Sequence, residues 1–391
     1  MIYYILVIAA YILLGKLIFN TSANPAGKFH ASAAAYFFAI VTIWFIIFIN
    51  IKHIRTITTI PNKWIFKLPL LYYTYALFFS PLSLIPMVSL FRAISGIGFV
   101  IASISIGKSL SKYPLEKRIK TFSKILILIL IVGIISNYLF QAVYLKIYSP
   151  LQLKAGYIGL ICTYLSLWYL IDYYTKHKKK YLFLSLFLLF SASLLHSFSA
   201  YIAYYAAFIY LSFYLRKYLQ AILLTAIPLY LLPIIIHYLK THPYKIILGK
   251  PAAAYLIGSG RFEVYMAAID AFINKLNEIN KIFGVGFMAE RDILASYHLT
   301  WSSDPHNSFL MSLLGLGLIG TLLYTGYIIA PFFYIKKLRK LYNENYVLKW
   351  IGMHIMFSIY GLTSSSYLAT PSIQLILFLL FSYILLKGEK I

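Results

Sequence analysis

The chain has 391 residues, of which 61% are hydrophobic and only 12% are charged, whereas a soluble domain is about 25% charged. This composition excludes an ordinary soluble domain, and the mean hydropathy of +0.80 indicates a membrane protein. The net charge of +25 would suit nucleic-acid binding, but no nucleic-acid motif accompanies the Lys and Arg residues. The single cysteine, Cys162, excludes an internal disulfide and a cysteine-based metal site.

Apolar residues occur in runs of roughly 18 to 22, and a helix of that length crosses a bilayer core of about 30 Å. We therefore predict an all-α, polytopic membrane protein whose residues 1–391 form a single membrane domain. The first run has no basic residues before it, so we predict a spanning helix there and no cleaved signal. Pro81 and Pro86 obscure the boundary between the third and fourth spans. The twelve predicted spans cover roughly residues 2–19, 32–51, 68–87, 93–107, 125–144, 155–171, 181–195, 200–215, 219–237, 308–335, 350–364 and 371–386.

Basic residues are divided unequally between the two sets of loops. With the N-terminus inside, the even-numbered loops and the C-terminal tail hold 23 Lys and Arg residues, whereas the short loops of the other side hold 4. Because cytoplasmic loops carry the excess of Lys and Arg, we predict a protein of the cytoplasmic membrane with both termini in the cytoplasm. Topology and contact with anionic membrane lipids then explain most of the net charge without nucleic acid. The large loop at 238–307, between the ninth and tenth spans, is predicted to be extracytoplasmic.

The extracytoplasmic loop contains a predicted amphipathic helix after Arg261, which lies on the membrane surface or caps the mouth of the bundle. Ser259 or Gly260 is the predicted N-cap, so Arg261 falls in the first turn, where backbone N–H groups favour an anion. A cation there opposes the helix dipole, which indicates an anionic ligand such as a phosphate. An ion pair with Glu263 or a contact with a lipid headgroup is the alternative. The predicted apolar face is Phe262, Tyr265, Ile269, Phe272, Leu276, Ile279 and Phe283.

A second polar motif, Asp304-Pro305-His306-Asn307, precedes the tenth span. Asp304 is the predicted N-cap and Pro305 the first helical residue, which places His306 in the first turn. A helix N-terminus disfavours the imidazolium, and a neutral imidazole accepts a proton from a hydroxyl. Anchoring in the headgroup region is the alternative role of His306. The Gly284–Phe287 turn is a predicted hinge, and three glycines of the tenth span predict close helix packing: Gly315, Gly317 and Gly320.

Three motifs in this order resemble the O-antigen ligase and O-antigen polymerase family of bacterial envelopes. They are the helix start at 260–265 with its arginine and tyrosine, the Gly-Val-Gly-Phe turn, and His306 followed by Asn-Ser-Phe-Leu and a glycine-rich span. Their order, spacing and side of the membrane agree with the family over about residues 239–325. Outside this region the resemblance consists mainly of the number of spans.

The resemblance implies a metal-independent and cofactor-free glycan transfer at the outer face of the bacterial inner membrane, in lipopolysaccharide or other surface polysaccharide biosynthesis. The donor would be a glycan on undecaprenyl diphosphate. The acceptor would be lipid A-core for a ligase or a second lipid-linked glycan for a polymerase, and both remain open. By the resemblance, Arg261 would hold the diphosphate, and His306 would activate or orient the acceptor hydroxyl.

Two further cations are candidates for diphosphate binding: Lys154, where the family often has an arginine, and Arg92 at the outer end of the fourth span. The chain departs from the family at 196–200, which reads His-Ser-Phe-Ser-Ala where an arginine is often found. The rival hypothesis is a transporter, a flippase or exporter of lipid-linked glycans. It is disfavoured because charges are nearly absent from span centres, with Asp172 and His354 at or near span ends.

Overall fold

The computed structural model describes residues 63–140, 156–194, 198–217, 261–297, 305–364, 367–369 and 372–386, and between 217 and 261 only eight further residues. This part of the chain is all-α, as predicted, apart from one short antiparallel pairing of β1 (Ile246–Ile247) with β2 (Lys250–Pro251). Predicted spans 2–19 and 32–51 lie outside the described residues, as does almost all of 219–237.

Helices cover the remaining nine predicted spans. The third and fourth have shifted boundaries, because Pro81 lies in a 3₁₀ turn and Pro86 is the first residue of a helix, the position that proline favours. The helices are α4 (Trp64–Phe79), η1 (Ser80–Leu82), α5 (Pro86–Leu110), α6 (Leu115–Phe140), α7 (Gly156–Lys176), α8 (Lys179–Leu194), α9 (Phe198–Tyr214), α12 (Arg261–Asp270), η5 (Ala271–Lys275), α13 (Glu278–Phe283), α14 (Glu290–Ala295), α15 (Ser308–Leu341), α16 (Glu344–Gly361) and α17 (Ile373–Leu386).

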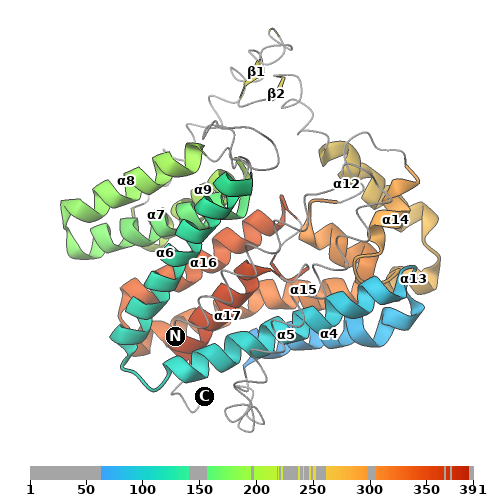
Figure 1. Ribbon diagram of the computed structural model, residues 1–391, viewed down its shortest axis with the longest axis horizontal. Helices are drawn as coiled ribbons and strands as arrows, with labels where there is room; N and C mark the ends of the chain where they lie inside the picture. Colours follow the sequence, from blue (N-terminus) through green and yellow to red (C-terminus); the bar gives the residue numbers. More distant parts are fainter. Residues whose placement is uncertain are drawn as a thin grey trace.

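The long helices form two packed groups. In one group α4 packs against α5 and α15, and α5 packs against α17; in the other, α16 packs against α7 and α9, and α8 packs against α7. Figure 1 shows the α5–α6 and α7–α8 turns at one end of the bundle and α12, α13 and α14 at the opposite end. The bundle therefore has two chemically different ends, because the first carries basic turns and the second carries the 261–297 segment, in which five acidic and four basic residues nearly balance.

Helix α17 lies at the centre of the bundle. All 14 of its residues are buried, as expected of a helix that is apolar on every side. Two cations bind the carbonyl groups at its C-terminal end: Lys63 Nζ donates to Leu386 O, and Arg118 Nη1 donates to Ile384 O at 3.1 Å. Positive charge stabilises a helix C-terminus because it opposes the negative end of the dipole.

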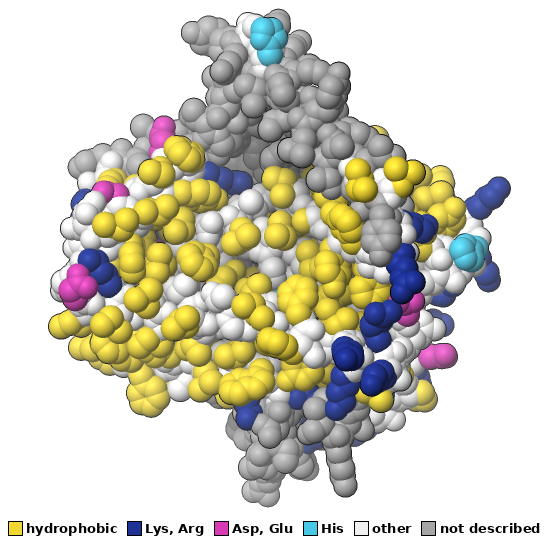
Figure 2. Space-filling model, turned by 180° about the vertical axis from the view of Figure 1, so that it is seen from behind, with side chains coloured by type: hydrophobic (Ala, Val, Ile, Leu, Met, Phe, Trp, Pro, Cys, Tyr) yellow, Lys and Arg dark blue, Asp and Glu magenta, His cyan; other side chains and the backbone are white. Residues whose placement is uncertain are grey.

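Within the described residues, two helices are long and apolar enough to cross a membrane, α5 and α15, and α17 is a shorter apolar helix. Large side chains are exposed on other helices as well; Phe183 of α8 is 71% exposed and Phe190 is 65% exposed. Figure 2 shows a broad area of hydrophobic side chains on one face of the molecule. Lys and Arg gather along the side of this face where the α5–α6 and α7–α8 turns lie.

Helix α15 is interrupted at Gly317, whose φ of 64° and ψ of −161° are not helical. The interruption breaks the ladder of backbone hydrogen bonds, and the 284–287 turn docks beside it. Val285 N donates to Leu314 O at 3.0 Å, and Gly286 N donates to Gly315 O at 2.9 Å. On its other side the same turn accepts hydrogen bonds from Leu84 N and Ser89 Oγ. The turn that we predicted to be a hinge is thus fixed on two sides, and it joins the 261–297 segment to the bundle.

Candidate functional site

Arg261 is the first residue of α12, as predicted, and its side chain is partly buried. Its Nη1 atom donates to Ser199 Oγ at 3.3 Å, at the start of α9. In the part of the chain that the structure describes, no carboxylate lies within ion-pair distance of Arg261, and Glu263 is exposed. The structure therefore does not contain the alternative Arg261–Glu263 ion pair. Ser199 belongs to the 196–200 stretch, so one described residue of the stretch that lacks the family's arginine contacts Arg261.

Tyr265 connects α12 to two other parts of the chain. Its hydroxyl lies 3.5 Å from His306 O and 3.3 Å from Leu362 O, so the first of these hydrogen bonds is at the weak limit. Burial raises the pKa of Tyr265, and the charge of Arg261 and a hydrogen bond with Asn307 oppose part of that rise. The hydroxyl consequently stays protonated at neutral pH and can donate.

His306 lies before α15 and not in its first turn, so that prediction is wrong. The N-cap is Asn307, whose Oδ1 atom accepts hydrogen bonds from Phe309 N at 2.9 Å and Leu310 N at 3.1 Å. Asparagine caps a helix as well as aspartate does, and Asp304 itself lies outside the described residues. His306 has a positive φ of 48°, a conformation that costs about 1–3 kcal/mol for a residue other than glycine and is concentrated at functional sites. The argument that the helix dipole keeps His306 neutral no longer applies.

Tyr265 links the two predicted site residues, because the charge of Arg261 acts on its hydroxyl, which lies 3.5 Å from the backbone oxygen of His306. The charge of Arg261 also acts on the hydroxyl of Tyr360, near the end of α16. We call these residues the Arg261 cluster: Ser199, Arg261, Tyr265, His306 and Tyr360. It combines one guanidinium, one imidazole and several hydroxyl groups, a set that can bind an anion and a hydroxyl-bearing molecule side by side.

The other two predicted diphosphate ligands do not join this cluster in the described structure. Arg92 is buried in the second turn of α5, and no interaction of the described residues links it to Arg261. Lys154 lies outside the described residues. Arg261 is therefore the cation on which the assignment of an anion site rests.

The predicted amphipathic helix is divided into two. It passes from α12 into the π-helical η5, breaks at Leu276, and resumes as α13 where Asn277 Oδ1 accepts a hydrogen bond from Asn280 N. The predicted apolar face is also partly wrong, because Phe262 is 66% exposed and Ile279 is 68% exposed. Small residues face the core instead, since they let α12 approach its neighbours closely: Val264, Ala267, Ala268 and Ala271.

Two features of this region escaped the sequence analysis. Ser199 lies in the 196–200 stretch, for which the sequence indicated only the absence of the family's arginine. Glu290 is fully buried at the start of α14, where its Oε2 atom lies 3.1 Å from the position of a Cβ on Gly315. A glutamate in a polar loop is usually solvated, and the sequence around it holds no signal of burial.

A hydrogen-bond network around Asp270, where α12 passes into η5, predicts how the stability of the fold depends on pH. Tyr297 Oη donates to Asp270 Oδ2 at 2.5 Å, and Asn274 Nδ2 donates to Asp270 Oδ1 at 2.7 Å. The hydrogen bond from Tyr297 is the main cause that holds the pKa of Asp270 below its usual range. A carboxyl with a lowered folded-state pKa stabilises the fold at neutral pH and loses that contribution as the pH falls through the lowered value.

Replacement of Tyr297 by phenylalanine is therefore expected to raise the pKa of Asp270 toward its usual value. The full chain in micelles, with carbon-13-labelled aspartate, permits an NMR titration of the carboxyl resonances. Tyr113→Phe, an exposed tyrosine at the other end of the bundle, is the control and should leave the Asp270 titration unchanged. An unaltered Asp270 curve in Tyr297→Phe would contradict the assignment of this hydrogen bond.

Metal binding was not predicted, and within the described residues no group of three or more His, Cys, Asp and Glu side chains is placed to hold a metal ion. The comparisons with known proteins place the chain in no family. No protein-family model matches it, and no curated protein matches it either.

Proposed function

We propose that the chain is a membrane glycosyltransferase of the O-antigen ligase or polymerase type. It transfers a glycan from undecaprenyl diphosphate to a sugar hydroxyl at the outer face of the cytoplasmic membrane. The observation that carries the proposal is the partly buried Arg261 at a helix N-terminus, with no carboxylate partner among the described residues. Its charge acts on Tyr265, whose hydroxyl contacts the backbone oxygen of His306. Such a site is complementary to the diphosphate that leaves when the glycosidic bond to the donor breaks.

The proposal includes the membrane topology, with twelve spans and both termini in the cytoplasm. Three basic turns support it, those between α5 and α6, α7 and α8, and α15 and α16, which share one end of the bundle. The α12–α14 region occupies the opposite end. Exposed hydrophobic side chains cover the face between these ends, as expected of helices that contact lipid.

In the proposed reaction, the acceptor oxygen forms a bond to the anomeric carbon while the bond from that carbon to the diphosphate oxygen breaks. Arg261 and the N–H groups of the first turn of α12 stabilise the negative charge that develops on the diphosphate. His306 activates or orients the acceptor hydroxyl, whose proton leaves as the new bond forms. Tyr265 fixes the backbone of His306 relative to Arg261. The charge of Arg261 fills the role that a metal ion has in other diphosphate chemistry, so the proposal needs no metal or cofactor.

The transporter alternative requires a polar path through the helices, and one observation bears on it. His354 is fully buried in the middle of α16. Its Nε2 atom donates to Ile328 O at 2.7 Å, and its Nδ1 atom accepts from Tyr367 Oη at 2.9 Å. Both ring nitrogens are thus used within the protein, which supports a role of His354 in joining α16 to α15 over a role in transport.

The test uses a host whose own glycan ligase or polymerase gene is deleted, supplied with this chain and its source glycan pathway. Arg261→Gln and His306→Gln are each expected to lower glycan transfer roughly 10- to 100-fold. A hydrogen bond to a charged group contributes about 1.5–3 kcal/mol, and about 1.4 kcal/mol corresponds to tenfold in rate. Lys275→Gln removes an exposed cation of the same region and should leave transfer unchanged.

Gel analysis of envelope glycans distinguishes the outcomes, with membrane insertion measured in parallel. A ladder on the lipid-linked glycan that requires Arg261 and His306 identifies a polymerase, and glycan on lipid A-core identifies a ligase. If both variants insert normally and glycan transfer is unchanged, the proposed site is wrong. Accumulation of untransported glycan on the inner leaflet would then favour the transporter.

A further inference from the structure

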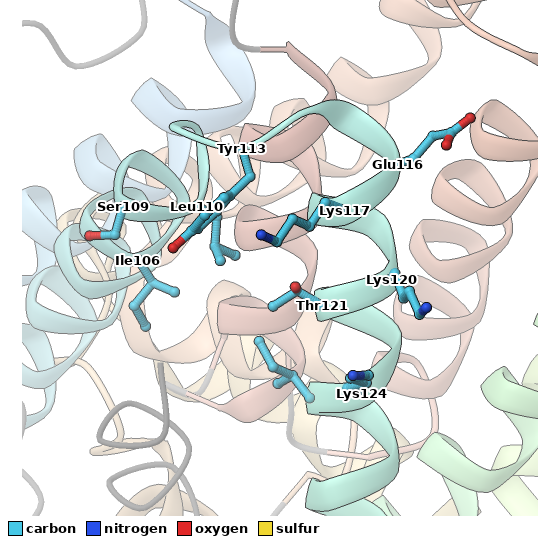
Figure 3. Close-up of a pocket in the computed structure, with 10 residues that line it drawn as sticks. Ile106, Ser109, Leu110, Tyr113, Glu116, Lys117, Lys120, Thr121 and Lys124 are labelled. Carbon is cyan, nitrogen blue, oxygen red and sulfur yellow. The ribbon is translucent and has the colours of Figure 1, made fainter.

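A cavity of about 720 Å³ lies between the end of α5 and the start of α6, at the end of the bundle opposite to Arg261. Figure 3 shows Lys117 and Thr121 of α6 directed toward this cavity, and Glu116, Lys120 and Lys124 also belong to its lining. Lys117 and Thr121 are one helical turn apart, so they share a face of α6. The cavity has no part in the glycan chemistry proposed above.

The polar part of the cavity has a net positive charge, from Lys117, Lys120 and Lys124 against Glu116, and it carries hydroxyl groups. Lys117 Nζ lies 4.4 Å from the centre of the Tyr113 ring, and this cation–π contact holds the ammonium at the cavity. The hydroxyl groups of Ser109 and Thr121 line the same space. A neighbouring cation is committed elsewhere, since Arg118 binds the C-terminal end of α17. This arrangement is complementary to a phosphate group.

The remaining wall is apolar. Ile106 and Leu110 of α5 and Ile125 of α6 contribute buried side chains to it. From Lys117 to Ile125 the cavity follows α6 for about 12 Å at 1.5 Å per residue. The headgroup layer of a bilayer is about 5–8 Å thick on each side of the hydrocarbon, so this length extends from the headgroups into the hydrocarbon. A free phosphate would leave the apolar wall uncovered.

We propose that the cavity binds an anionic phospholipid of the cytoplasmic leaflet. The phosphate lies against Lys117, Thr121 donates a hydrogen bond to it, and the first part of an acyl chain covers Ile106, Leu110 and Ile125. The inference rests on the membrane orientation proposed above, because the cavity adjoins the basic α5–α6 turn at the cytoplasmic end. Anionic lipids are concentrated in that leaflet and attract basic segments next to a span.

The experiment uses the purified full chain in detergent micelles with added phosphatidylglycerol, and native mass spectrometry measures the fraction of protein that retains one lipid. Lys117→Gln is expected to weaken retention about fivefold, the effect of one Lys beside an anionic lipid surface. Lys112→Gln removes an equal charge from the α5–α6 turn, at an exposed residue that is not among the lining residues of the cavity. It should leave retention within twofold of that of the unaltered chain.

Two further measurements distinguish binding of a lipid phosphate from binding of free inorganic phosphate. Phosphatidylcholine should be retained less well than phosphatidylglycerol, and inorganic phosphate at millimolar concentration should not displace the lipid. Equal loss of retention in Lys117→Gln and Lys112→Gln, or displacement of the lipid by inorganic phosphate, would overturn the proposal. Both lysines are exposed, so both variants should fold. Glycan transfer by these variants, measured as above, tests the proposed function separately from lipid binding.

Discussion

Replacement of Gly317 by alanine is expected to destabilise the protein by about 4 kcal/mol. With φ of 64° and ψ of −161°, Gly317 occupies a backbone region that is almost restricted to glycine, at a cost of about 1–3 kcal/mol for other residues. A Cβ atom would also lie 2.3 Å from Ile282 O and 2.6 Å from Gly284 N. Both atoms are backbone, so they cannot rotate away, and α13 and the 284–287 turn would have to move. Overpacking of this kind adds about 1–3 kcal/mol.

Thermal unfolding in detergent measures this effect. Size-exclusion chromatography after heating gives the fraction of protein that stays folded at each temperature. At about 2.1 cal/mol/K of unfolding entropy per residue, a loss of about 4 kcal/mol in a chain of 391 residues corresponds to a decrease in Tm of about 5 °C. Gly326→Ala is the matched control in the same helix, because its Cβ would meet only Leu68 side-chain atoms at 3.7 Å, an ordinary contact distance. Equal Tm values for the two variants would show that α15 is not interrupted at Gly317.

Replacement of Asp172 by asparagine is expected to destabilise the protein by about 3–5 kcal/mol, because it leaves the buried ammonium of Lys349 without a carboxylate. Lys349 Nζ lies 2.8 Å from Asp172 Oδ2, and the two side chains are only 3% and 5% exposed. The other contact of Lys349 is with the ring of Trp168, at 4.3 Å. A desolvated cation–π contact contributes about 2 kcal/mol or somewhat more, and this contact is already present in the unaltered protein, so it does not replace the carboxylate.

Lys349→Met is expected to cost less, about 1–2 kcal/mol, because Asp172 keeps two partners. These are Lys176 Nζ at 2.8 Å and Asn345 Nδ2 at 3.0 Å. The double variant Asp172→Asn/Lys349→Met should be more stable than Asp172→Asn alone, since it removes the uncompensated charge. The same thermal measurement gives the interaction energy as a double-mutant cycle. A double variant as unstable as the sum of the single variants would contradict this account.

The sequence by itself determined the features that depend on neighbours along the chain. Apolar runs predicted the described helices, because the backbone in an apolar run satisfies its hydrogen bonds within a helix. The Gly-Arg start predicted that α12 begins at Arg261, as it does. The number of spans and the direction of insertion come from the same local signals, and they stay predictions, as does the glycan chemistry that the motifs imply.

Only the tertiary structure decided which distant groups meet. Arg261 contacts Ser199, 62 residues away, and the hydroxyl of Tyr265 reaches His306 O, 41 residues away. The interruption of α15 depends on the 284–287 turn, whose N–H groups bind Leu314 O and Gly315 O. Such contacts depend on how helices pack, and packing depends on the shape of both surfaces at once. For this reason the small residues of α12 face the core, while Phe262, the larger and more apolar side chain, faces outward.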